Sequence, residues 1–79
     1  MNMHRSFYRA TLRIIKHYPN KRMQQFHHQV IKQEYRYKSG DLQQAYIGYL
    51  VALESLKLQR RYFKYHHLPL DPLPPHLED

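Results

Sequence analysis

Cysteine and tryptophan are absent from this sequence, and glycine occurs only twice. The lack of cysteine excludes disulfides and cysteine nucleophiles, and two glycines are too few for a loop that cradles phosphate. No stretch approaches ~18 consecutive apolar residues, so none is predicted to span a bilayer. A chain of 79 residues forms at most one domain with a small core. We therefore expect a permanent partner to supply part of its stability.

Acidic side chains are missing from the first 33 residues, whereas seven basic ones occur there: Arg5, Arg9, Arg13, Lys16, Lys21, Arg22 and Lys32. From Glu34 onward six basic residues balance six acids, so the N-terminal part carries the net charge of +7. Such a basic region indicates an acidic protein, a nucleic acid or an anionic lipid as partner. The first sixteen residues also resemble a mitochondrial presequence, and we interpret them as a structural helix that can serve as an uncleaved import signal.

Apolar side chains, 42% of the chain, recur with helical spacing in three segments. The first helix runs to Tyr18, where Pro19 ends it, with an apolar face of Phe7, Thr11, Ile14, Ile15 and Tyr18. The second runs from the N-cap Asn20 to Ser39 and Gly40, and its core stripe is predicted to be Met23, Phe26, Val30 and Tyr37, with Ile31 and Tyr35 beside it.

The third helix runs from Asp41, an N-cap followed by Gln44 as in a capping box, to Tyr65. Its seam has spacings of four and three, with one position taken by Arg60: Leu42, Tyr46, Tyr49, Leu53, Leu56 and Phe63. Short connections favour neighbouring antiparallel helices, so residues 1–65 are predicted to form an all-α, three-helix antiparallel bundle. Residues 66–79 contain four prolines and are predicted to form an extended tail whose leucines lie apart from the bundle. Such a tail is either disordered or laid across the surface of a partner.

Two short motifs resemble a known family. The run Phe7-Tyr8-Arg9, with Arg13 after it, is similar to the Leu-Tyr-Arg signature that opens the first helix of mitochondrial LYR-motif proteins. Glu34-Tyr35-Arg36 resembles that family's acidic-Phe-Arg element, and Asp41 opens the third helix as in the family. The likeness covers residues 5–65, with Phe7 in place of the first Leu and Tyr35 in place of Phe. Ala52 stands where many members carry a glycine.

The resemblance implies a non-catalytic accessory subunit of a large mitochondrial assembly, most simply a respiratory complex, in the matrix or on the matrix side of the inner membrane. Its partner would be acylated mitochondrial acyl carrier protein, which supplies the acyl-4′-phosphopantetheine group; the chain itself would hold no cofactor. The residues expected to contact the carrier are Tyr8, Arg9, Lys32, Tyr35, Arg36 and Lys38. Those expected to line a lumen for the acyl chain are Phe7, Ala45 and Ala52.

Two other functions fit parts of the sequence. Basic and aromatic residues interleave in residues 60–65, as on an RNA surface, which leaves a small RNA-contacting protein of the mitochondrial ribosome as the alternative. The first helix could instead lie on a membrane surface. The pairs His27-His28 and His66-His67 have no acid or thiol at ligand spacing, so no metal site is predicted. No nucleophile is arranged with a base, so we expect no enzyme activity.

Overall fold

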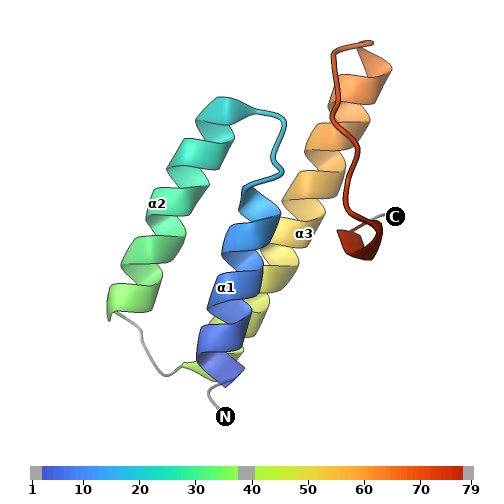
Figure 1. Ribbon diagram of the computed structural model, residues 1–79. Helices are drawn as coiled ribbons and strands as arrows, with labels where there is room; N and C mark the ends of the chain where they lie inside the picture. Colours follow the sequence, from blue (N-terminus) through green and yellow to red (C-terminus); the bar gives the residue numbers. More distant parts are fainter. Residues whose placement is uncertain (1–2, 38–40, 78–79) are drawn as a thin grey trace.

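The computed structural model describes residues 3–37 and 41–77. Over these ranges the chain forms three α-helices, α1 (Met3–Ile15), α2 (Lys21–Tyr37) and α3 (Leu42–Tyr65), followed by a 3-10 turn, η1 (Pro75–Leu77). Neither range contains a β-strand, so the expected all-α fold is confirmed (Figure 1). No helix in these ranges combines the length and apolar character that a membrane span requires.

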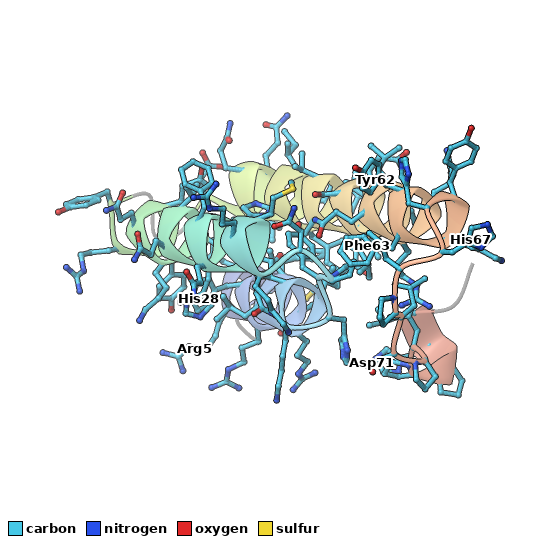
Figure 2. All side chains as sticks on the ribbon, turned by 90° about the horizontal axis from the view of Figure 1, so that it is seen from above. Arg5, His28, Tyr62, Phe63, His67 and Asp71 are labelled. Atoms are coloured by element: carbon cyan, nitrogen blue, oxygen red, sulfur yellow. The ribbon has the colours of Figure 1, made fainter. Side chains whose placement is uncertain are left out.

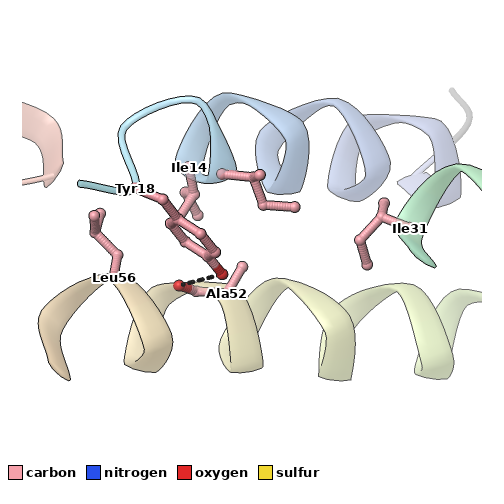
Figure 3. Close-up of a cluster of buried hydrophobic side chains, with 6 residues drawn as sticks. Ile14, Tyr18, Ile31, Ala52 and Leu56 are labelled. Atoms are coloured by element: carbon pink, nitrogen blue, oxygen red, sulfur yellow. Dashed lines mark hydrogen bonds between the residues drawn. The ribbon is translucent and has the colours of Figure 1, made fainter. Parts of the chain in front are cut away.

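The core lies mainly between α1 and α3 (Figure 3). Helix α1 contributes the predicted face, with Thr11, Ile14 and Ile15 buried and Phe7 half-buried. The opposite face of α1 carries exposed basic residues, so this helix separates its two faces as the sequence predicts. The buried apolar cluster consists of Ile14, Ile15, Tyr18, Ile31, Ala52 and Leu56.

Two predicted N-caps are confirmed. The Asn20 Oδ1 accepts a hydrogen bond from the Met23 amide at 3.1 Å, and the Asp41 Oδ1 accepts one from the Gln44 amide at 3.1 Å. Helix α1 ends at Ile15, before the predicted limit at Tyr18, and a turn bonded from the Tyr18 amide to the Ile15 carbonyl follows it. The predicted end of the second helix at Ser39 and Gly40 lies outside the described residues.

The predicted core stripe of α2 is wrong. Met23, Phe26 and Tyr37 are exposed, Val30 is half-buried, and the buried residue of this helix is Ile31. The reason is that α2 meets α1 through a mixed face, where the Gln24 side chain donates to the carbonyls of Ile15 and Lys16 at 3.2 and 2.7 Å. Those carbonyls end a helix and need donors, so polar contacts there outweigh apolar ones.

The predicted seam of α3 is correct from Tyr49 onward and wrong at its N-terminal end. Leu56 is buried and Tyr49, Leu53 and Phe63 are half-buried, whereas Leu42 and Tyr46 are largely exposed. Small residues make the closest approach to the other helices: Ala52 is fully buried, and Gly48 faces Ile31 of α2. The predicted seam considered only large side chains and therefore missed these positions, where small residues let the helix axes come close.

The prediction that the tail's leucines lie apart from the bundle is wrong for Leu73 and Leu77, which pack against the core cluster. The chain reverses after α3 through His67, whose φ of 55° is left-handed, and the Leu68 amide donates to the Phe63 carbonyl at 2.8 Å. Arg60, the residue that interrupts the seam, donates from Nη1 to the Asp71 carbonyl at 2.8 Å. The tail therefore runs back along α3 as part of the fold (Figure 1).

Candidate functional site

A pair of stacked tyrosines joins α1 to α2 at the centre of the candidate site. The rings of Tyr8 and Tyr35 lie 4.1 Å apart with 26° between their planes. His4, one turn before Tyr8, also stacks on Tyr35, with ring centroids 5.1 Å apart. Residues four apart share a helix face, so the sequence alone places His4 and Tyr8 together, and α2 supplies Tyr35, which contacts both rings.

A surface groove opens on the outer side of this pair, between α1 and α2. Its lining residues are Tyr8, Gln29, Lys32, Gln33, Tyr35 and Arg36. Four of the six residues predicted to contact a carrier protein, Tyr8, Lys32, Tyr35 and Arg36, therefore lie together. Arg9 is exposed and follows Tyr8 in the chain, whereas Lys38 lies outside the described residues. The groove combines an aromatic wall with cations, which suits an anionic partner.

A small cavity lies on the inner side of the same pair, bounded by all three helices. Its lining residues are His4, Tyr8, Thr11, Ile31, Glu34, Tyr35, Asp41, Gln44, Ala45 and Gly48. The cavity measures about 30 Å³, room for about two water molecules. Since Tyr8 and Tyr35 line both spaces, the stacked pair forms the wall between groove and cavity.

The residues predicted to line an acyl lumen do not come together. Ala45 lines the cavity. Phe7 instead packs its ring against Tyr46 and Tyr49 of α3, with centroids 5.3 and 5.7 Å apart. Ala52 is fully buried in the core. Sequence reasoning missed the cavity residues Thr11 and Gly48, although the spacing of Ala45, Gly48 and Ala52 on one helix face could have indicated a path of small residues.

A buried hydrogen-bonded pair fixes the other end of α2. The Tyr18 hydroxyl lies 2.7 Å from His27 Nδ1 of α2. It donates to the Ala52 carbonyl of α3 at 3.4 Å (Figure 3), so it links the end of α1 to both other helices. Desolvation by burial raises the pKa of Tyr18, against a smaller lowering by Ser55. Desolvation also lowers the pKa of His27, against a smaller raising by the charge of Glu34. Both groups are therefore held neutral near pH 7.

Cations dominate the outer side of α1. Arg5, Arg9, Arg13 and Lys16 recur there at spacings of four and three, and all four are exposed. Figure 2 shows Arg5 on the side of α1 away from α3, and Tyr62 of α3 on the opposite side of the molecule. The basic surface of α1 therefore faces away from the outer side of α3.

The chemistry that these residues offer is binding. The groove presents cations and aromatic rings, and both polar and apolar side chains line the cavity. Comparison with protein-family models, with curated proteins and with solved structures finds no match to this chain.

Proposed function

We propose that this chain is a non-catalytic accessory subunit that binds acylated mitochondrial acyl carrier protein and anchors it to a larger mitochondrial assembly, such as a respiratory complex. The motifs around Tyr8 and Tyr35, which resemble those of LYR-motif proteins, motivate the proposal. The observation that carries it is the stacked Tyr8–Tyr35 pair, which separates a basic outer groove from an inner cavity. This arrangement suits a ligand with an acidic body and a thin arm.

Charge supports the outer half of this interaction. Acyl carrier proteins are acidic, and Lys32, Arg36 and Arg9 lie on or beside the groove with exposed side chains. Charge-assisted hydrogen bonds to carboxylates are roughly twice as strong as neutral ones. The acid-free surface of α1 extends the field beyond the groove and would accelerate association with such a partner.

The cavity on the inner side of the tyrosine pair would receive the phosphopantetheine arm and its acyl chain. Parting the Tyr8–Tyr35 pair would connect the groove to the cavity, whose lining includes the polar residues His4, Glu34 and Gln44 and the apolar residues Ile31 and Ala45. The polar lining residues suit the amides of the pantetheine arm, and the apolar ones suit an acyl chain. Burial of each acyl methylene stabilises the complex by about 0.8 kcal/mol.

A cavity of about 30 Å³ must widen to hold a long chain, and the packing of α2 supports a way to do so. The N-terminal end of α2 is fixed by hydrogen bonds from Gln24 and by the His27–Tyr18 pair. Toward its C-terminal end the buried contact is Ile31, followed by the Tyr35 stack. We therefore expect α2 to pivot about its Gln24 end and to open at Tyr35.

The experiment is co-purification of the tagged chain from mitochondria, with intact mass spectrometry of what it retains. We expect a carrier protein with a long acyl group, and its loss in Arg9→Glu/Arg36→Glu. The matched control is Lys57→Glu/Lys64→Glu, which changes the net charge equally but lies on α3, away from the groove. Retention by both double variants, or recovery of RNA in place of a carrier, would contradict the proposal.

A further inference from the structure

Helix α3 is apolar on two opposite sides, unlike α1. One side packs against α1 through Tyr49, Ala52 and Leu56. The other side carries large apolar side chains that are 43 to 79% exposed: Ile47, Leu50, Val51, Leu58, Tyr62 and Tyr65. A helix that is apolar all round is normally buried, and a contiguous exposed apolar patch marks an interaction site. We call these six residues, with Glu54 and Arg61, the outer face of α3.

The spacing along this face is that of a coiled-coil seam. At about 100° per residue, its eight members fall within roughly one third of the helical circle. Ile47, Val51, Glu54, Leu58, Arg61 and Tyr65 follow one another at alternating steps of four and three, the pattern that packs one helix against another. Neither the tail nor α2 covers the seam: the tail leucines pack on the core cluster beside α1, and Figure 2 shows Tyr62 on the outer side of α3.

Two opposite charges interrupt this seam symmetrically. Glu54 and Arg61 are exposed, lie seven residues apart on the same face, and have Leu58 between them. In the part of the chain that the structure describes, neither side chain makes a hydrogen bond or ion pair. Seven residues of helix span about 10.5 Å, so a two-fold axis near Leu58 would bring each Glu54 opposite the Arg61 of an antiparallel copy.

We propose that the outer face of α3 binds a second copy of this chain in an antiparallel, two-fold arrangement. A two-fold interface uses the same patch on both copies and must be self-complementary. This face meets that condition, because Leu58 can pack near its own equivalent while two reciprocal Glu54–Arg61 pairs form on either side. In each copy the basic surface of α1 lies on the side away from the proposed interface. The two basic surfaces are therefore kept apart in the dimer.

This dimer does not depend on the carrier-binding proposal, since the residues that line the groove come from α1 and α2 and none of them belongs to the outer face of α3. The test is sedimentation analysis of the full-length chain over a roughly hundredfold range of concentration, because dimerisation depends on mass action. We expect a monomer–dimer equilibrium in the parent. Glu54→Arg and Arg61→Glu should each weaken it roughly tenfold or more, because like charges then meet twice per dimer. Circular dichroism of both variants should match the parent, since both positions are exposed.

Mixing the two single variants distinguishes specific pairing of Glu54 with Arg61 from a general loss of affinity. Glu54→Arg has two cations on the face and Arg61→Glu has two anions, so an equimolar mixture should form a heterodimer although each variant alone is mainly monomeric. The combined variant Glu54→Arg/Arg61→Glu should dimerise like the parent. A parent that stays monomeric, single variants that dimerise normally, or a mixture that stays monomeric would each overturn the proposal.

Discussion

Tyr18 is the largest fully buried side chain, and it ends in a hydroxyl. A buried tyrosine hydroxyl needs a partner, and here it has two, His27 of α2 and the Ala52 carbonyl of α3. Tyr18, which lies three residues past the end of α1, thus joins all three helices. The sequence was enough to assign the apolar ring of Tyr18 to the core. It was not enough to identify His27 as the partner of the hydroxyl, because the predicted apolar stripe of α2 is not the face that turns inward.

His27 gives the fold a pH dependence with a definite sign. Desolvation lowers its folded-state pKa below the ordinary 6.5, so the unfolded chain binds more protons near that pH. The stabilisation is fully present above 6.5 and is lost as pH falls through the lowered pKa. In urea titrations between pH 8 and ~5, the parent should lose more unfolding free energy than His27→Gln. The exposed His28→Gln should behave as the parent, and equal slopes for parent and His27→Gln would contradict this role.

Gly48 offers a change that separates stability from ligand binding. A Cβ at this position would lie 3.8 Å from Ile31 Cδ1, an ordinary contact. Glycine in a helix interior is destabilising by roughly 0.5–1 kcal/mol relative to alanine, so Gly48→Ala should raise the unfolding free energy by about that amount. The same methyl enters the cavity and should weaken binding of acylated carrier. A less stable variant, or one that binds acylated carrier as the parent does, would contradict this account of the cavity.

Among the elements, α1 follows its sequence pattern most closely because one face of it is basic and the other apolar. Helix α2 does not, since Gln24, His27 and Tyr35 make inward contacts beside Ile31 while Phe26 is 70% exposed. Periodicity identifies which residues share a face, but hydrogen bonds to the end of α1 decide which face turns inward. The same limit applies to the candidate site. The resemblance of the two motifs to those of a known family placed Tyr8 and Tyr35 in one site, but the cavity behind them could not be predicted, because it depends on how closely the three helices pack.

The tail is part of the fold, so its removal should lower the stability of the protein. Leu73 and Leu77 are half-buried against the core, and partial burial of two leucines contributes about 2 kcal/mol. Deleting residues 69–79 should therefore lower Tm by ~10 °C, given 4–8 °C per kcal/mol for a small domain. Thermal unfolding followed by circular dichroism measures this.

A side-chain control accompanies the deletion. Asp71→Ala keeps the backbone carbonyl that accepts from Arg60 and should leave Tm close to that of the parent, whereas Leu73→Ala/Leu77→Ala should reproduce most of the loss. An unchanged Tm after the deletion would mean that the tail does not stabilise the bundle in solution.

At the scale of the whole molecule, the three helices form a thin body with principal extents of 41, 24 and 14 Å. Its two broad sides differ in chemistry: α1 and the groove carry the cations, and the outer face of α3 carries exposed apolar residues. A small domain with so little interior gains stability from partners. Both proposals follow from this division, with a carrier protein on the basic side and a second copy on the apolar side.

The central claim is that the space behind Tyr8 and Tyr35 receives an acyl chain. The most direct measurement is calorimetric titration of the parent chain, side by side, with carrier protein bearing a long acyl group and with the same carrier bearing unacylated phosphopantetheine. Ten buried methylenes at about 0.8 kcal/mol each exceed the cost of widening a packed site, roughly 1–3 kcal/mol. Binding of the acylated form should therefore be tighter by at least about a hundredfold. Equal affinity for the two forms would contradict the account.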